Sequence, residues 1–540
     1  MGLFAFASTP GLAVHKIEIT DDSSVPVKPR NAAEAESLFI GPPPPPRLVE
    51  YSEEINPRLK KALDAILNEE VLWGVDVGFV AYDLEREQVL AQTSPNLLIN
   101  PASNVKLFTA AAAFRLLGPE YTWKTEYYVT GKMVRGTLYG DLIVKGYGDP
   151  SVVNERLQKV AEDLYLAGLR RVQGRIIVDS SFFDDNETPR GWELEEAPDR
   201  AYAAPVSALT LNFNAIGIHI RPGLRGEPAV VALDPPIENG IVAGEITTGR
   251  RFGGLRLRSA PQGQGTLISV KGRVGHQDRP RRFYRRIYNP PIYFGNALKH
   301  FLSGKGIVVK RYVQRGALPE GARLFHVDHS PPLTKVISDL NHYSNNVIAE
   351  TIIKTIGAEL GGAPGSFESG LQEARTFLEA EVGLTPGEYI FENGSGLNDV
   401  NRMTSAQVIQ LLAYMENEFD AGVEFKRSLA VAGTQGTIRL RMRHGVAERR
   451  LRAKTGTLRG VSALSGYVAD PANDQIAFSI LMTGYERPVH VYDIWKIQNR
   501  LGEALASWGE SYKPLDPALA DPMLAETNDP SHEPSKGGAP

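Results

Sequence analysis

The stretch Asn100-Pro-Ala-Ser-Asn-Val-Lys-Leu-Phe-Thr-Ala-Ala-Ala-Ala-Phe114 places a serine and a lysine three positions apart at the start of an apolar run. Residues three apart lie on one face of a helix, so we expect Ser103 and Lys106 to face each other. Free N–H groups at a helix start favour an anion near Ser103. Leu107 and Phe108 should make an ammonium group costly, so Lys106 is expected to have a lowered pKa and to take the serine proton.

Ser-x-x-Lys is too short to decide a function by itself. In the simpler interpretation Ser103 caps the helix and the Lys106 side chain reaches out to solvent. Two later motifs favour the chemical interpretation. Ser344-Asn345-Asn346 stands between two predicted helices, and Lys454-Thr455-Gly456-Thr457 lies on a predicted strand. The order Ser-x-x-Lys, Ser-x-Asn, Lys-Thr-Gly is the signature of serine β-lactamases and penicillin-binding proteins.

Each later motif also has a chemical use. Ser344 can relay a proton to a leaving group, and Asn346 can hold a substrate amide. Lys454 offers a cation to a substrate carboxylate and Thr455 a hydroxyl beside it, while the glycine after Thr455 lets the backbone approach closely. The simpler alternatives are a helix cap for the Ser-Asn-Asn stretch and a strand-end turn for the Lys-Thr-Gly-Thr stretch.

Apolar periodicity predicts helices and strands at both ends of the chain, with a different pattern between them. Helices are expected at 56–70, 105–117, 333–341, 346–356, 367–381, 405–418 and 489–508. Strands are expected at 75–82, 88–91, 451–456, 461–468 and 475–482. From about 123 to 331, short alternating runs with frequent glycine predict strands at 124–131, 136–145, 174–179, 211–220 and 255–258.

These patterns give four predicted parts. Residues 1–47 read as a flexible, Pro-rich leader ending in Pro42 to Pro46. Residues 48–125 together with 332–510 form the predicted catalytic domain. Residues 126–331 form a β-rich insertion of two subdomains, and residues 511–540 a disordered tail.

The spacing of the motifs resembles one family. Ser103 and Ser344 are 241 positions apart, far more than a compact β-lactamase would need, and the gap holds the insertion. The chain therefore resembles the low-molecular-mass class C penicillin-binding proteins, which are D-alanyl-D-alanine carboxypeptidases and endopeptidases (penicillin-binding protein 4-like). Stretches beginning at Gly136, Tyr202 and Asn393 also resemble that family.

The resemblance implies an α+β fold: a penicillin-binding, β-lactamase/transpeptidase-like domain with a five-stranded antiparallel sheet, helices on both sides and a large β-rich insertion. It implies a serine peptidase that acts on peptidoglycan stem peptides and cross-links through an acyl-enzyme and that β-lactam antibiotics inhibit covalently. Ser103 would be the nucleophile, with the oxyanion held by the backbone N–H groups of Ser103 and Thr457. No metal or other cofactor is implied, and the expected location is periplasmic or extracytoplasmic.

Four further residues are candidates for substrate specificity. After Gly394-Ser-Gly-Leu397 the family often has Ser-Arg, and this chain has Asn-Asp, so Arg402 would have to read an acidic group on the substrate. Glu195 and Glu196 could favour a free amine on the third residue of the stem peptide, with Trp192 covering its aliphatic part. The simpler alternative for the two glutamates is a solvated acidic turn.

Composition excludes several classes of protein. The chain of 540 residues has no cysteine, so disulfides, thiolate zinc sites and cysteine nucleophiles are absent. Its net charge of −4 argues against nucleic acid. Arg279 to Arg286 hints at an anionic polymer, but a solvated strand face is the better interpretation. A metal site at His326 and His329 lacks a third ligand, so a turn is the better interpretation.

The N-terminus leaves the export signal open. Met1 to Ser8 is apolar but lacks the positive start of a secretory signal, whereas Ala5-Phe6-Ala7 has a cleavage-site pattern. No run is long enough to be a transmembrane anchor. Two other functions remain as alternatives: a β-lactamase that turns penicillin over rapidly, and a non-catalytic wall-binding protein that kept the fold.

Overall fold

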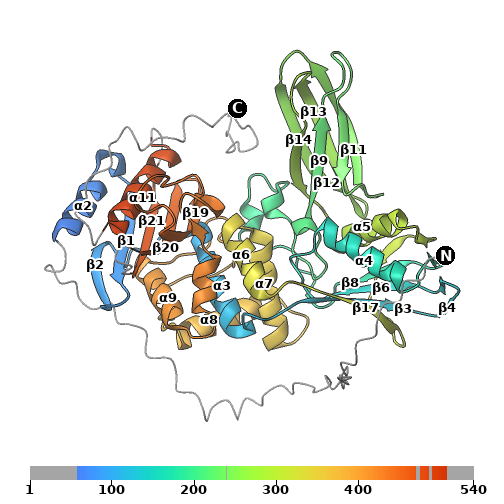
Figure 1. Cartoon of the computed structure of the whole chain (residues 1–540), viewed down its shortest axis with the longest axis horizontal. Helices are drawn as coiled ribbons and strands as arrows, with labels where there is room; N and C mark the ends of the chain where they lie inside the picture. The colour runs from blue at the N-terminus through green and yellow to red at the C-terminus, as the bar shows by residue number, and fades with distance from the viewer. Residues whose placement is uncertain (1–56, 239, 470–474, 486–488, 508–540) are drawn as a thin grey trace, which may run out of the picture. The chain divides into compact units, whose positions relative to one another are not determined.

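A computed structural model describes residues 57–238, 240–469, 475–485 and 489–507. Its central feature is a six-stranded sheet in the order β18-β19-β20-β21-β1-β2 (Figure 1), in which every neighbouring pair is antiparallel. The strands are β1 (Asp76–Asp83), β2 (Gln88–Thr93), β18 (Ala430–Val431), β19 (Leu451–Leu458), β20 (Val461–Ala469) and β21 (Gln475–Thr483). The prediction of five strands missed β18, which is only two residues long and pairs with β19.

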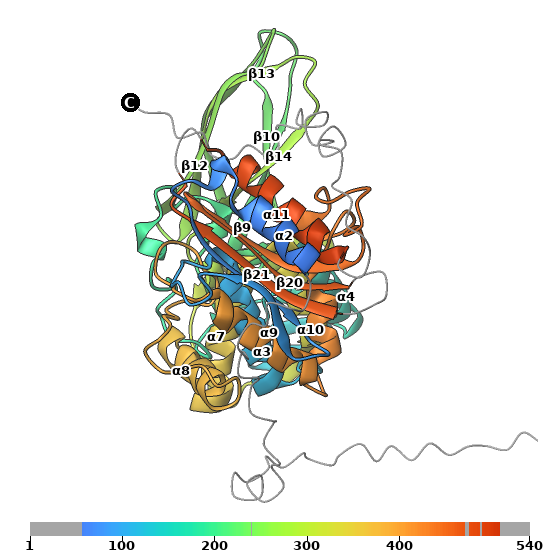
Figure 2. The same cartoon turned by 90° about the vertical axis from the view of Figure 1, so that its left-hand side faces the viewer.

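Both faces of this sheet are buried, because alternate side chains of each strand enter different cores. On β1, Phe79 and Ala81 pack with α2 (Pro57–Leu67) and α11 (Val491–Ala506). Figure 2 shows these two helices side by side over the sheet. On the same strand, Val80 and Tyr82 face a second core, which helices on the opposite face of the sheet form.

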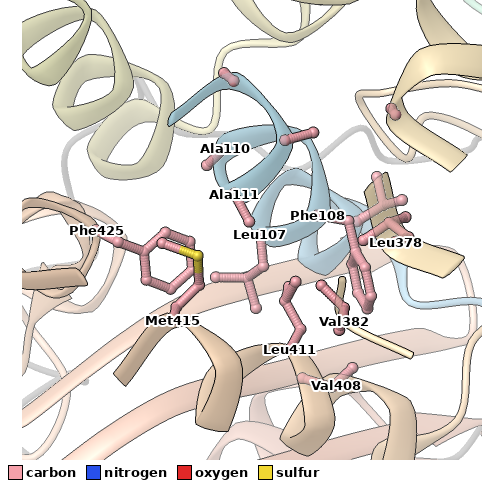
Figure 3. Packing of buried hydrophobic residues seen from close by; sticks show 14 of the residues in the cluster. Leu107, Phe108, Ala110, Ala111, Leu378, Val382, Val408, Leu411, Met415 and Phe425 are labelled. Atoms are coloured by element: carbon pink, nitrogen blue, oxygen red, sulfur yellow. The ribbon is translucent and has the colours of Figure 1, made fainter. Parts of the chain in front are cut away.

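Helix α3 (Val105–Leu117) lies in the middle of that second core. Leu107 and Phe108 meet side chains of α8, α9 and α10 there, and the alanines that follow let other helices approach closely (Figure 3). The surrounding helices are α6 (Leu333–Tyr343), α7 (Asn346–Gly361), α8 (Phe367–Ala380), α9 (Ser405–Asn417) and α10 (Gly422–Ser428). Every residue of α3 from Val105 to Phe114 is therefore buried.

Residues 124–329 form four smaller sheets around a core of their own. Two of them have the orders β16-β8-β6-β3-β17 and β15-β7-β5-β4. Their strands are β3 (Lys124–Val129), β4 (Lys132–Val134), β5 (Thr137–Tyr139), β6 (Leu142–Gly146), β7 (Arg171–Val172), β8 (Ile176–Asp179), β15 (Val308–Val309), β16 (Val313–Arg315) and β17 (Arg323–His329). Because β17 pairs with β3, the first and last strands of this segment lie side by side, and the chain enters and leaves it at the same place.

The other two sheets are β10-β9-β14 and β11-β13-β12. Their strands are β9 (Ala215–Arg221), β10 (Val230–Asp234), β11 (Gly240–Gly249), β12 (Gly253–Gln262), β13 (Gly265–Gly275) and β14 (Arg281–Arg286). In both views these strands project on the same side of the molecule, away from the six-stranded sheet (Figures 1 and 2).

Several details of the predicted insertion are wrong. It contains two helices, α4 (Asn154–Leu166) and α5 (Pro290–Gly304), that pack into its core. The predicted strand 136–145 is divided between β5 and β6, which lie in different sheets. His326 and His329 lie on strand β17 and not in a turn.

The α+β class is confirmed, whereas the domain boundaries stay a prediction. The predicted leader, 1–47, and the predicted tail, 511–540, lie outside the described residues.

Candidate active site

Ser103 lies in a short 3₁₀ turn, η2 (Ala102–Asn104), that leads directly into α3. Its Oγ does not cap the helix. It lies 3.0 Å from Nζ of Lys106, whose side chain is completely buried. The simpler interpretation, a serine cap beside a solvent-seeking lysine, is therefore wrong for both residues.

Lys106 Nζ has two further neighbours, and both can only accept a hydrogen bond. It donates to Oδ1 of Asn346 at 2.7 Å and to the carbonyl oxygen of Ser395. The Asn346 amide keeps this orientation because its Nδ2 donates to the carbonyl of Tyr202 at 3.0 Å. A neutral amine has two hydrogens and one lone pair. Two acceptors therefore leave the lone pair of neutral Lys106 for the hydroxyl of Ser103.

Burial lowers the pKa of Lys106 to about 7, and the nearby carboxylate of Glu350 limits that fall. Glu350 lies on α7, one turn after Asn346, and is itself completely buried. It accepts the backbone N–H groups of Gly394 at 3.2 Å and Ser395 at 2.8 Å. Burial raises the pKa of Glu350, while these hydrogen bonds oppose the rise.

Sequence reasoning missed Glu350. Its position four residues after Asn346 was a usable signal, because that spacing puts both side chains on one helix face. What the spacing could not reveal is the loop that supplies its hydrogen-bond donors, 44 residues further along the chain.

A second lysine–serine pair stands between α6 and β19. Ser344 ends α6 in the left-handed region, with φ of 55°. Lys454 Nζ donates to Oγ of Ser344 at 2.7 Å and to the carbonyl of Thr455 at 2.9 Å. Burial, and after it the charge of Lys106, lowers the pKa of Lys454 well below its ordinary value. Gly456, two residues after Lys454 on β19, lies against the backbone just before Ser103, so both pairs belong to one site.

The backbone before Ser103 is held between two close glycine contacts. Ala102 has a positive φ of 45°, which is uncommon for a residue with a side chain. A Cβ on Gly396 would lie 1.9 Å from the Ala102 carbonyl oxygen, and one on Gly456 would lie 2.7 Å from that of Pro101. Glycine at both positions lets the loop and β19 close on the turn that carries Ser103.

The two threonines after Lys454 differ in their surroundings. Thr455 Oγ1 donates to Oγ1 of Thr437 at 2.8 Å. Thr457 is exposed on β19 and directly follows Gly456, which packs against η2.

Trp192 is the one predicted specificity residue that reaches this cluster. It is buried, and its Nε1 donates to Oγ of Ser395 at 3.2 Å, so it adjoins the residue whose carbonyl binds Lys106. Glu195 accepts the hydroxyl of Tyr202 at 3.0 Å. Glu196 is exposed, and no hydrogen-bond or ion-pair partner is present for it in the described part of the chain.

Arg402 is not free to act as an isolated cation. It forms an ion pair with Asp399 at 2.8 Å. Asn100 links that loop to the serine turn, because its amide donates to Asp399 at 2.9 Å and accepts from the N–H of Ala102 at 2.8 Å. Burial acts to raise the pKa of Asp399, but the hydrogen bonds from Arg402 and Asn100, together with the charge of Arg402, outweigh it and lower that pKa.

Two negative findings concern the described residues. They contain no helix long and apolar enough to cross a membrane. Within the same ranges, no three His, Asp or Glu side chains gather as ligands for a metal ion.

Comparison with known proteins shows the family of the chain. Residues 59–500 match the D-Ala-D-Ala carboxypeptidase 3 (S13) family. The chain is 31% identical over 488 residues to the D-alanyl-D-alanine carboxypeptidase of Actinomadura sp. strain R39, covering 87% of this chain and 88% of that one. It is 24% identical to the D-alanyl-D-alanine carboxypeptidase DacB of Haemophilus influenzae, covering 76% and 86% of the two chains.

The fold is also that of a solved penicillin-binding protein. Penicillin-binding protein 4 of Haemophilus influenzae superposes with a TM-score of 0.70 at 22% identity, covering 83% of this chain and 99% of that one. The same protein complexed with a β-lactam gives a TM-score of 0.66. The predicted penicillin-binding fold is thus confirmed, and the chain belongs to the D-Ala-D-Ala carboxypeptidase 3 (S13) family.

Proposed function

We propose that this protein is a serine D-Ala-D-Ala carboxypeptidase, and also an endopeptidase, that cuts peptidoglycan stem peptides and their cross-links through an acyl-enzyme on Ser103. The observation that carries the proposal is the contact of a fully buried Lys106 with Ser103 Oγ at 3.0 Å. Peptidoglycan lies outside the cytoplasm, so we place the protein in the periplasm or another extracytoplasmic space.

In the acylation step, neutral Lys106 takes the proton of Ser103 as Oγ attacks the carbonyl carbon of the penultimate D-alanine. The backbone N–H groups of Ser103 and Thr457 receive the oxyanion, and one such donor typically contributes about 3–4 kcal/mol to the barrier. The C–N bond then breaks, and the departing amine gains a proton through Ser344. Water completes the reaction by hydrolysing the ester on Ser103.

Lys454 would bind the terminal carboxylate of the substrate, with the hydroxyl of Thr455 beside it. Its lowered pKa fits this use, because an incoming carboxylate would stabilise the charged form of the lysine. Lys454 also contacts Ser344 at 2.7 Å. The residue that binds the carboxylate therefore touches the residue that passes the proton to the leaving group.

β-Lactams are proposed as covalent inhibitors that acylate the same serine. A relative of the same fold has been solved with a β-lactam, which supports the proposal by analogy. A β-lactamase would instead release the drug rapidly, and a non-catalytic wall-binding protein would not react with it. No cofactor enters the mechanism.

The direct test uses two substrates: a synthetic stem peptide ending in D-Ala-D-Ala, which should release D-alanine, and a cross-linked dimer, which should be cut into its two monomeric stem peptides. We expect both reactions with wild type and neither with Ser103→Ala. D-Alanine release without cleavage of the dimer would remove the endopeptidase assignment, and the absence of both reactions would remove the proposal.

For substrate preference, we propose that Glu195 and Glu196 favour a free amine on the third residue and that Trp192 covers its aliphatic part. Tyr202 already occupies one oxygen of Glu195, so the exposed Glu196 is the better placed carboxylate. Changing both to glutamine should lower kcat/KM for the amine peptide by a factor equivalent to up to about 1–2 kcal/mol of activation free energy. The kcat/KM for its N-acetylated analogue should stay nearly unchanged. Equal losses on the two peptides would indicate damage to the site. Arg402 could bind an acidic group of the substrate only if its ion pair with Asp399 breaks.

A further inference from the structure

Three loops meet at one end of the two projecting sheets. They are residues 222–229, 250–252 and 276–280, which we call the tip loops. The N–H of Gly226 donates to the carbonyl of Thr248 at 2.8 Å, and the N–H of His276 donates to that of Gly249 at 2.9 Å. These bonds join the end of β11 to the other two loops. The tip loops therefore form one continuous surface.

The tip loops and the strands that lead to them are basic. The three loops hold four arginines against Glu227 and Asp278, and residues 240–286 as a whole contain eleven Lys and Arg but only two Asp and Glu, although the whole chain has a net charge of −4. Four of the tip-loop arginines, Arg225, Arg250, Arg251 and Arg279, are exposed. In the part of the chain that the structure describes, none of the four has a carboxylate partner within 4.0 Å. Like charges that repel one another in the free protein favour an anionic partner.

The same surface exposes two large apolar side chains. Leu224 is 73% exposed and Phe252 is 44% exposed. The guanidinium of Arg281 lies 4.6 Å from the centre of the Phe252 ring and holds that ring at the surface. Isolated exposed apolar residues are common, but these two lie among unpaired arginines at the end of a projecting part.

We propose that the tip loops bind an anionic phospholipid membrane surface. Arg225, Arg250, Arg251 and Arg279 would bind lipid phosphates, which the guanidinium group matches with two parallel hydrogen bonds. Leu224 and Phe252 would enter the boundary between headgroups and acyl chains. A water-soluble polyanion would satisfy the arginines equally well, but it would give the two apolar side chains nothing to bury in. The apolar pair is why we favour a membrane.

Vesicle sedimentation with the full chain tests the proposal. We expect binding to phosphatidylglycerol-containing vesicles, little binding to pure phosphatidylcholine vesicles, and weakening with salt. The combined variant R225Q/R250Q/R251Q/R279Q should bind at least about tenfold more weakly, since each basic residue near an anionic surface contributes. The matched control R58Q/K61Q/R450Q/K496Q removes the same charge from exposed positions outside residues 124–329 and should bind within about twofold of wild type.

The apolar contribution has its own test. L224S/F252S should also weaken vesicle binding at least about fivefold while leaving binding to soluble polyphosphate unchanged. Equal losses in the charge variant and its control would overturn the proposal. So would tip-dependent binding to polyphosphate with none to vesicles, which would identify an anionic polymer as the partner. Ser103→Ala should bind vesicles normally, so failure of the peptidase proposal would not affect this result.

Discussion

Lys106 is the base in the proposed mechanism, so its charge should set the pH dependence of acylation. Its pKa is lowered by burial to about 7, so the ammonium prevails below that pH and the neutral base above it. We expect the rate constant for acylation by penicillin to rise about tenfold per pH unit below the midpoint and to level off above pH 8. Stopped-flow or mass-spectrometric time courses from pH 5 to 9 would measure it. A rate independent of pH over this range would mean that Lys106 is not the base.

Glu350 is expected to act on that midpoint. Its negative charge favours the ammonium form of Lys106, so Glu350→Gln should lower the pKa of the lysine and move the midpoint to lower pH by roughly half a unit or more. Glutamine keeps an acceptor for the N–H of Ser395, so the loop should persist.

The matched control for this prediction is Glu503→Gln. Glu503 is also a buried carboxylate that accepts a backbone N–H, that of Ala447 at 2.9 Å, but it lies on α11 across the sheet from Lys106. Its replacement should leave the midpoint where it is. A midpoint that moves equally in both variants would indicate a general effect of lost stability.

At the scale of elements, the close approach of β19 to η2 should be required for reaction. Gly456→Ala would place a Cβ 2.7 Å from the Pro101 carbonyl and push the serine turn away from Lys106. We expect acylation to slow at least about 100-fold, with a loss of about 1–3 kcal/mol in the free energy of unfolding.

Gly78→Ala provides a comparison within the same sheet. A Cβ on Gly78, in β1, would lie 3.0 Å from Oγ of Ser405 and makes no contact with η2. Urea denaturation should show a loss of stability for this variant, and acylation should stay within about threefold of wild type. If Gly456→Ala acylates as fast as Gly78→Ala, the proposed role of the glycine is wrong.

The elements that carry the motifs were predictable because each has a strong local signal. The helix expected at 105–117 agrees with α3, and the strand expected at 451–456 lies within β19. The two helices of the insertion were missed for different reasons. In α4, Leu157, Val160, Ala161 and Leu164 do follow helical spacing, but short glycine-bounded strands surround them. In α5 the residues from 290 to 295 are all buried, so no polar face marks the first half of the helix.

At the scale of the whole molecule, helix α7 connects the parts of the site. Along one face, at intervals of four residues, Asn346 binds Lys106, Glu350 binds the loop at 394–395, and Lys354 binds Asp184 and the carbonyl of Asn186. The last contact fixes the segment that leads to Trp192. The order of the three motifs in the sequence predicted the site. The contacts that the 394–395 loop and the segment at 184–186 make with α7 depend on tertiary structure and could not be predicted.

The most direct test of the central claim is the intact mass of the protein after brief exposure to penicillin. If Ser103 is the nucleophile, the mass should increase by that of one drug molecule, the adduct should persist, and Ser103→Ala should show no increase. A wild-type protein that neither gains mass nor hydrolyses the drug would contradict the account. So would a Ser103→Ala variant that is labelled as fully as wild type.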